Sequence, residues 1–292
     1  MVKTYAQIYM DGRKALLEQE DPQSASFMAR QLLMQITGKS YAKFLADQNL
    51  YASEEIEKAM DAGITRLRQG EPLAYVLGEW EFYGLNLQVT PDVLIPRDDT
   101  CAVVQLAIHQ PLFLPESPRI LDLCTGSGCI GLALASRIKD ARVTLADISK
   151  EALAVAKKNA ASNKLPHITC IQADALKPAA PFLGKFDMIV SNPPYINAWD
   201  MEQLPKSVAD YEPHLALYGG EDGLDFYRSI AKNFKSALKP GGYLAFEFGE
   251  DQGDDICRIL TENGFDIQQR VRDYNDTERA VLARLREEIH HG

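Results

Sequence analysis

"RILDLCTGSGCIGLALASRIKDARVTLAD", residues 119–147, is the stretch that decides the fold. It begins and ends with short apolar runs, 119–123 and 142–147, whose length and composition are typical of buried strands. A glycine-containing turn and an apolar helical segment lie between the two runs. A strand, a helix and a second strand in this order predict a βαβ unit with parallel strands.

The same alternation continues toward the C-terminus. Further strands are predicted in "ITCIQAD" (168–174), "FDMIVSN" (186–192) and "YLAFEFG" (243–249), with helical segments between them and a stop at Pro240-Gly241-Gly242. The last apolar stretch, 265–285, indicates two strands joined by a turn. We therefore expect an α/β fold, with a doubly wound, mostly parallel Rossmann-like sheet that has an antiparallel end.

The N-terminal residues 1–70 have a helical pattern instead. Apolar residues recur at helical spacing in residues 24–38, and Gly38 is a typical C-terminal stop. Residues 53–70 begin with Ser53, a favourable N-cap, followed by acidic residues in the first turn. These signals predict a small domain of amphipathic helices.

Aromatic and β-branched residues alternate around Gly84 within residues 75–90, which predicts a β-hairpin. We therefore expect three parts. Residues 1–70 form a helical domain for substrate recognition, residues 71–96 form a hairpin linker, and residues 97–292 form the catalytic α/β domain.

Composition limits the classes of function. The chain of 292 residues has a net charge of −10, and residues 1–70 hold nine of its 31 basic and nine of its 41 acidic residues. The remaining 22 basic and 32 acidic residues make a nucleic-acid-binding surface an unfavourable expectation. No apolar run is long enough for a membrane span or a signal peptide, so we expect a cytoplasmic protein without membrane contact.

The five cysteines indicate reduced thiols, because their number is odd and no CxxC pair occurs. Cys124 and Cys129 lack an accompanying histidine or second cysteine pair. We therefore expect no metal site.

Ligands of open parallel sheets bind at the carboxyl ends of the strands. The first strand leads through Asp122 into a turn whose glycines, Gly126 and Gly128, allow close approach of a ligand to the backbone. The spacing does not match the G-x-G-x-x-G dinucleotide fingerprint. The expected cofactor contacts at this turn are Asp122, Cys124, Thr125, Gly126, Ser127 and Gly128.

The next two strands also end in acidic residues. Asp147 is placed to accept hydrogen bonds from both hydroxyls of a ribose, although an acid here is also a candidate N-cap for the following helix. Asp174 is placed to accept from an adenine amino group, and Ala175, the next residue, is also an expected cofactor contact. Together these strand ends resemble those of class I S-adenosylmethionine-dependent methyltransferases, with Asp122 beneath the methionine portion of the cofactor. A nicotinamide dehydrogenase is the alternative, but its dinucleotide-binding turn would be expected to have a third glycine.

The fourth strand delivers Asn192-Pro193-Pro194-Tyr195 to the same edge. Asn192 is expected beside the sulfonium of the cofactor and is therefore also an expected cofactor contact. The side-chain Oδ1 of Asn192 and the carbonyl of Pro193 are two acceptors that suit a planar NH₂ group, and Tyr195 can stack on that plane. Accepting both N–H groups returns electron density to the nitrogen lone pair, which favours attack on a methyl group. Adenine N6, cytosine N4 and glutamine N5 all present such a group.

A family resemblance distinguishes among these substrates. The motifs "EPLAYVLGEWEFYGLNLQVTPDVLIPRDDT", "DLCTGSGCIGLALA", "SNPPYI", "YEPHLALYGGEDGLDFYRSI" and "GGYLAFEFGEDQG" resemble the HemK-type release factor glutamine methyltransferases. The resemblance runs from about residue 71 to the C-terminus. It implies that residues 97–292 form an S-adenosylmethionine-dependent methyltransferase domain, with Asn192, Pro193, Pro194 and Tyr195 binding the substrate and promoting transfer.

The implied reaction is N5-methylation of the glutamine in the Gly-Gly-Gln loop of peptide chain release factors, by a monomer. Alternatives are a ribosomal-protein glutamine methyltransferase, which shares this site, a DNA adenine-N6 methyltransferase, and an S-adenosylmethionine-binding adaptor without turnover. The chain departs from the family pattern at three positions. Cys124 replaces a common glycine, Asp98 a proline, and Ala175 an aromatic residue that often lies by the adenine.

Overall fold

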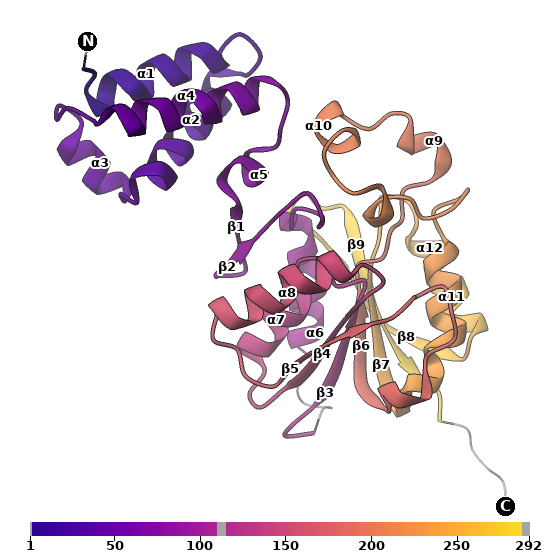
Figure 1. Ribbon diagram of the computed structural model, residues 1–292. Coiled ribbons are helices and arrows are strands. Elements are labelled where there is room, and N and C mark those ends of the chain that lie inside the picture. Colours follow the sequence, from indigo (N-terminus) through magenta and orange to yellow (C-terminus); the bar gives the residue numbers. More distant parts are fainter. Residues whose placement is uncertain (1, 110–114, 288–292) are drawn as a thin grey trace, which may run out of the picture. The chain divides into compact units, whose positions relative to one another are not determined.

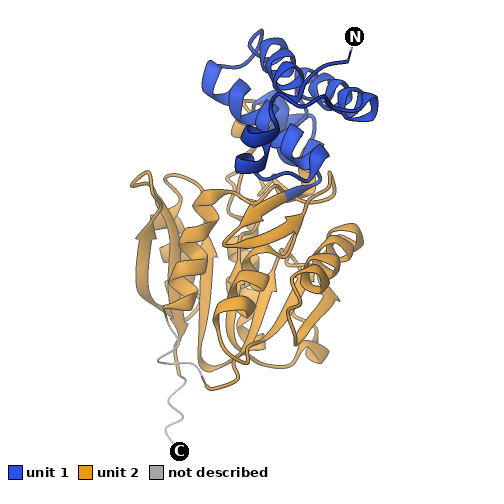
Figure 2. Ribbon diagram, turned by 90° about the vertical axis from the view of Figure 1, so that its left-hand side faces the viewer, with its two compact units in different colours: residues 1–79, 205–211 blue, residues 80–204, 212–292 orange. Residues whose placement is uncertain are grey.

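The computed structural model describes residues 2–109 and 115–287. The chain forms two compact units (Figure 2). The first contains residues 1–79 and 205–211, and the second contains residues 80–204 and 212–292.

The first unit is helical. Its helices are α1 (Tyr5–Leu16), α2 (Pro22–Thr37), α3 (Tyr41–Asp47), α4 (Glu54–Arg68), α5 (Leu73–Leu77) and α10 (Lys206–Ala209). The predicted signals are confirmed: Gly38 ends α2 in the left-handed conformation, and Ser53 caps α4 through its side chain. The segment 205–211 is tied to this unit where the Tyr211 hydroxyl donates to the Gln69 carbonyl at 3.0 Å.

The predicted hairpin is present, but it is shorter than the alternating pattern. Strands β1 (Glu79–Phe82) and β2 (Leu85–Gln88) pair around a turn in which Tyr83 and Gly84 both have positive φ. The residues just before it form α5, which ends at the left-handed Gly78. The alternation did not predict this helix, because a single turn between Pro72 and Gly78 is too short to show helical periodicity.

The second unit is built on a seven-stranded sheet. Its strands are β3 (Arg119–Leu123), β4 (Arg142–Asp147), β5 (Ile168–Gln172), β6 (Phe186–Ser191), β7 (Leu238–Glu247), β8 (Phe265–Arg272) and β9 (Glu278–Leu285). Their order is β5-β4-β3-β6-β7-β9-β8, in which β9 runs antiparallel to both of its neighbours and the other pairs are parallel. The predicted doubly wound sheet with an antiparallel end is confirmed.

Helices cover both faces of this sheet (Figure 1). Helices α6 (Cys101–Ile108), α7 (Cys129–Arg137) and α8 (Lys150–Ser162) share one apolar core, and α11 (Asp225–Asn233) and α12 (Gly253–Glu262) share the other. The short α9 (Ala198–Met201) follows β6. All six residues of β6 are buried, as expected for a central strand covered on both faces.

Several strand boundaries differ from the sequence-based expectation. β6 ends at Ser191, one residue before Asn192, and β7 ends at Glu247. β5 ends at Gln172, so Asp174 lies in the following loop. β7 begins at Leu238, so Pro240-Gly241-Gly242 lies inside the strand and not before it. The pairing of β6 with β7 shifts register between Phe186 and Met188, and such an irregularity accommodates a proline that cannot donate to the ladder.

Candidate active site

The turn between β3 and α7, residues 124–128, is called the glycine turn below. Cys124, Gly126 and Gly128 all have positive φ, at 61°, 53° and 86°. Cys124 is therefore a side-chain-bearing residue in a conformation that favours glycine, which gives a physical reason for the glycine expected there from the family pattern. The conformation turns the chain sharply from the end of β3 into α7.

Asp122 supports the glycine turn from inside the protein. It is fully buried, and its Oδ2 accepts from the Thr125 hydroxyl at 2.5 Å and from the Gly131 amide at 2.8 Å. Burial raises its pKa to about 7, while these hydrogen bonds oppose the rise. A Cβ on Gly131 would lie only 2.3 Å from the Leu145 side chain, so α7 packs closely against the sheet here.

Asp147 lies at the end of β4, beside the glycine turn. Its Oδ2 accepts from the Gly126 amide at 2.9 Å, and its Oδ1 accepts from the Ser149 amide at 3.0 Å. The N-cap of α8 is Ser149, so the alternative role of Asp147 as that cap is wrong. Burial raises the pKa of Asp147, and its backbone hydrogen bonds oppose the rise.

Asp174 and Ala175 lie in the loop after β5. The Oδ1 of Asp174 accepts from the Leu176 amide at 2.9 Å, and its Oδ2 pairs with Lys177 at 3.1 Å. Ala175 is buried, and its carbonyl accepts from the Ser229 hydroxyl of α11 at 2.7 Å. The loop is thus tied to α11.

Residues 192–195, called the proline loop below, follow β6. Ser191 ties the end of β6 to the end of β3, because its hydroxyl donates to the Leu123 carbonyl at 2.6 Å. Asn192 is half-buried, whereas Pro193 and Pro194 are buried. Burial raises the pKa of Tyr195 to about 12, which keeps its phenol neutral.

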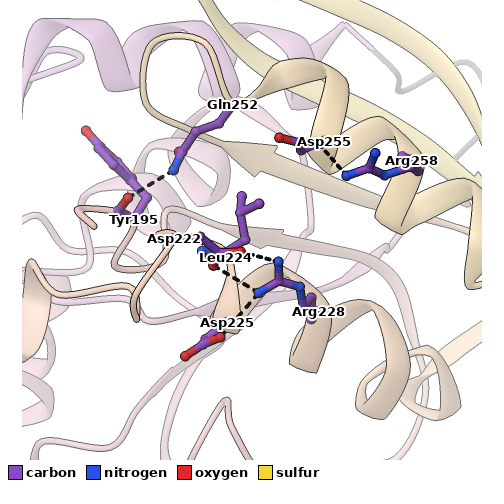
Figure 3. A network of polar contacts seen from close by, with 8 residues as sticks. All are labelled: Tyr195, Asp222, Leu224, Asp225, Arg228, Gln252, Asp255 and Arg258. Carbon is purple, nitrogen blue, oxygen red and sulfur yellow. Dashed lines mark hydrogen bonds and ion pairs between the residues drawn. The ribbon is translucent and has the colours of Figure 1, made fainter. Parts of the chain in front are cut away.

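Distant segments hold the proline loop in place. The Tyr195 carbonyl accepts from Gln252 Nε2 at 3.0 Å (Figure 3). The Oε1 of Gln252 in turn accepts from the Gly249 amide at 2.9 Å. A Cβ on Gly219 would lie 2.7 Å from both the Pro194 carbonyl oxygen and the Tyr195 Cα. The glycines of "YGGEDG" therefore allow this backbone to pass close to the loop.

The same neighbourhood contains an ion-paired helix start. Arg228 of α11 pairs with Asp222 and, at 3.3 Å, with Asp225, and the Leu224 amide donates to Asp222 at 3.1 Å (Figure 3). These contacts order the segment that contains the close glycines. Two quoted motifs, "YGGEDGLDFYRSI" and "GEDQG", thus act by shaping the proline loop.

These elements enclose a cavity of about 380 Å³. It is lined by Pro91, Asp92, Val93, Leu94, Pro96, Arg97, Thr100, Cys124, Thr125, Gly126, Ser127, Cys129, Ile130, Asp147, Ile148, Ser149, Glu151, Ala152, Ala173, Asp174, Ala175, Leu176, Asn192, Pro194, Pro213, Leu215, Ala216 and Phe226.

The cavity brings together most of the residues predicted as a site. Those lining it are Cys124, Thr125, Gly126, Ser127, Asp147, Asp174, Ala175, Asn192 and Pro194. Asp122, Gly128, Pro193 and Tyr195 are not among the described lining residues. Phe226 contributes an aromatic wall from α11, and no signal in the sequence distinguished it from core residues.

The segment before α6 also lines the cavity, although none of its residues was predicted as part of the site. Glu212 is buried and holds this segment: its Oε2 accepts from the Ile95 amide at 3.2 Å, and its Oε1 pairs with Arg97. A 3₁₀ turn, Asp98–Thr100, follows, and Asp99 pairs with Arg279 at 3.5 Å. The quoted motifs "LIPRDDT" and "YEP" were the available signal for this contact.

Among residues 2–109 and 115–287, no helix is both long and apolar enough to cross a membrane. In the same part of the chain, no group of three or more histidine, cysteine or acidic side chains is placed to hold a metal. All five cysteines are free thiols.

Two family models match parts of this chain. Residues 9–78 match the family model described as the PrmC N-terminal domain, and residues 105–207 match the one described as the Methyltransferase small domain. In solved structures, a ribosomal protein L11 methylase from Lactobacillus delbrueckii subsp. bulgaricus has a TM-score of 0.50 and 22% identity, over 69% of this chain and 86% of that one. This likeness shows the methyltransferase fold alone.

Curated relatives are more similar in sequence. The release factor glutamine methyltransferase of Clostridium acetobutylicum is 38% identical over 255 residues, which cover 87% of this chain and 89% of the relative. That of Fusobacterium nucleatum is 41% identical over 232 residues, which cover 79% of this chain but only 65% of the relative's length. The family resemblance noted in the sequence is thereby confirmed, and the chain belongs to the release factor glutamine methyltransferase family.

Proposed function

We propose that this protein transfers a methyl group from S-adenosylmethionine to the side-chain amide nitrogen of the glutamine in the Gly-Gly-Gln loop of peptide chain release factors. The proposal rests on one observation: a candidate substrate-binding loop and a candidate cofactor-binding turn line the same cavity. Asn192 and Pro194 reach it from β6, and Asp147 and the glycine turn reach it from β4 and β3.

The residues of the cavity fit S-adenosylmethionine. Each carboxylate oxygen of Asp147 accepts one backbone N–H and retains lone pairs for the two ribose hydroxyls. Asp174 offers an acceptor for the adenine amino group, and Phe226 and Leu176 offer apolar surface. The cavity volume of about 380 Å³ lies within the usual range for small-molecule sites. When bound, the cofactor would supply a methyl group on a sulfonium. The C–S bond electrons would return to sulfur, and the neutral thioether would leave without a proton from a general acid.

The proline loop orients and activates the amide. Asn192 Oδ1 and the Pro193 carbonyl each accept one hydrogen of the substrate NH₂, which fixes the direction of the nitrogen and raises the electron density of its lone pair. The neutral Tyr195 ring packs beside the amide plane. No basic side chain is required before transfer, because the amide nitrogen loses its proton only after the methyl group has been received.

We further propose that the helical residues 1–70 recognise the protein substrate, and that the enzyme acts as a cytoplasmic monomer. Arg30 lies over the rings of Phe27 at 5.8 Å and Tyr41 at 4.9 Å, and both rings are exposed. Surfaces rich in arginine and aromatic residues are typical of protein interfaces. Deleting residues 1–70 should raise KM for a release factor and leave the affinity for S-adenosylmethionine unchanged.

Methyl incorporation tests the proposal directly. Purified protein is incubated with radiolabelled S-adenosylmethionine and, separately, a release factor, a ribosomal protein and double-stranded DNA. Label should enter the release factor alone, and it should be lost when the Gly-Gly-Gln glutamine is changed to glutamate. A site built to bind an NH₂ group rejects an analogue without it by roughly 10⁴. Preferential labelling of the ribosomal protein or of DNA would establish one of the alternatives.

A further inference from the structure

Glu247 is a buried carboxyl group beside the proline loop. It is the last residue of β7 and only 2% exposed. Ser191 of β6 pairs with Phe246 of the parallel neighbour β7, so the next residues along the two strands are Asn192 and Glu247. Asn192 and Thr100 line the cavity, whereas Glu247 is not among the described lining residues. We therefore consider an effect of Glu247 on a bound substrate that acts through these two neighbours.

The surroundings of Glu247 leave its carboxyl group incompletely paired. Burial raises its pKa to about 8, while hydrogen bonds with the side chains of Thr100 and Asn192 oppose the rise. Its Oε2 has no hydrogen-bond partner. Some charged or titratable groups have an electrostatic effect on the pKa of Glu247, and Glu247 has one on the pKa of others. These groups are Arg279, Asp99, Tyr195, Tyr227, Cys101 and Cys129.

The proposed function requires one orientation of the Asn192 amide. Its Oδ1 must face the substrate NH₂, and its Nδ2 must therefore point elsewhere. An amide rotated by 180° would present N–H donors to another N–H donor and would repel the substrate. A carboxylate accepts hydrogen bonds but cannot donate them, so a carboxylate next to Asn192 selects the productive orientation. A protonated carboxyl group can instead donate to Oδ1 and select the unproductive one.

We infer that Glu247 is a positioning residue: its ionised carboxylate accepts a hydrogen bond from Asn192 Nδ2 and thereby keeps Oδ1 directed into the cavity. The inference rests on the proposed function of Asn192. A carboxylate in a protein interior is unfavourable unless hydrogen bonds or an opposite charge compensate for the lost solvation. The positioning role gives a reason for a carboxyl group at this buried place. The Asn192 orientation, and with it methyl transfer, should depend on the protonation of Glu247.

The sign of the pH dependence follows from this role. A protonated Glu247 can donate a hydrogen bond as well as accept one, so it no longer selects the productive orientation of Asn192. The rate of methyl transfer should therefore fall as pH decreases through the pKa of Glu247. A bound sulfonium is positively charged and favours the carboxylate, so the fall should be centred below pH 8 in the loaded enzyme. Single-turnover rates with both ligands saturating measure this step without interference from binding.

Glu247→Gln is the test variant, because it keeps the shape of the side chain and has a donor and an acceptor at every pH. Its single-turnover rate at high pH should be lower by roughly threefold to tenfold, the equivalent of one hydrogen bond, and independent of pH from 6.5 to 9. Glu278→Gln is the matched control. It makes the same change in β9, where Glu278 pairs with Arg270, and it should keep the wild-type profile.

A second measurement does not depend on the substrate. The side-chain ¹H–¹⁵N resonances of Asn192, identified by their absence in Asn192→Ala, should shift with pH in the wild type and remain fixed in Glu247→Gln. Resonances that do not move in the wild type, or equal pH profiles for the wild type and Glu247→Gln, would overturn the role of Glu247. If the wild type fails to methylate any release factor while the resonances titrate as expected, the proposed substrate is wrong and the positioning role stands.

Discussion

The glycine turn and the proline loop line one cavity, but they are held in different ways. The glycine turn is supported from within its own βαβ unit, by Asp122 below and Asp147 beside it. The proline loop depends on segments more than 20 residues away in sequence, which include Gly219, Glu247 and Gln252. A local βαβ motif is therefore sufficient to build the half of the cavity that we propose holds the cofactor, called the cofactor half below, whereas the half that we propose activates the substrate, called the reactive half, requires the completed sheet.

The largest expected effect is a loss of methyl-transfer rate when the reactive half alone is changed. Asn192→Ala should lower the single-turnover rate by about 10²–10³, by analogy with the loss of one preorganised transition-state hydrogen bond. The measurement is methyl transfer with both ligands saturating. The control Asn197→Ala removes the N-cap of α9, five residues after Asn192, and it should change the rate little. A wild-type rate for Asn192→Ala would make the proline loop only a structural turn.

The next largest effect is a loss of cofactor affinity when the cofactor half is changed. Asp147→Ala should weaken S-adenosylmethionine binding by about 1.5–3 kcal/mol, because hydrogen bonds to a charged acceptor are lost. Affinity should also fall with decreasing pH in the wild type, since the pKa of Asp147 is raised and its carboxylate is the acceptor. Titration calorimetry measures both, with the exposed Asp266→Ala at the edge of the sheet as control. Unchanged affinity would exclude Asp147 from ribose binding.

A smaller effect is expected when one of the distant contacts that hold the proline loop is removed. Gln252→Ala removes the hydrogen bond to the Tyr195 carbonyl and should lower kcat by roughly threefold to tenfold. Affinity for S-adenosylmethionine should stay within twofold of the wild type, because the glycine turn is untouched. Gln268→Ala, on the exposed β8, is the matched control. An equal loss in cofactor affinity would show that the two halves are not separately supported.

The last expected effect concerns stability and not catalysis. The pKa of Asp122 is raised to about 7 from an ordinary value near 3.8, so the folded protein retains a proton that the unfolded chain releases. The free energy of unfolding should therefore fall as pH rises between these values, by at most about 1.4 kcal/mol per pH unit from this group. Asp122→Asn should lose this component in denaturant titrations, and Asp266→Asn should keep it. Parallel pH curves for Asp122→Asn and the wild type would contradict the buried, protonated state.

Several elements were predictable because their signals are local. The boundaries of β3 and β4, the N-cap Ser53 and the stop at Gly38 follow from strand length, capping chemistry and left-handed backbone, which involve only neighbouring residues. The start of β7 was not predictable, because Leu238 joins the strand only by pairing with Phe186 of β6. The register then shifts across Pro240-Gly241-Gly242, where Gly241 has a positive φ of 68°, so the local turn signal lies inside the strand as an irregularity.

The sequence by itself determined the fold class, the family, and the placement of Asp147, Asp174 and Asn192 at or just after the ends of β4, β5 and β6, although only Asp147 lies within its strand. The tertiary structure alone decided which side chains support them. Glu212 holds the segment of Arg97, Gln252 holds Tyr195, and Glu247 lies beside Asn192. The physical reason is that strand alternation and turn chemistry are written in neighbouring residues. A buried carboxylate or amide finds its partner only when strands distant in sequence become adjacent in the sheet.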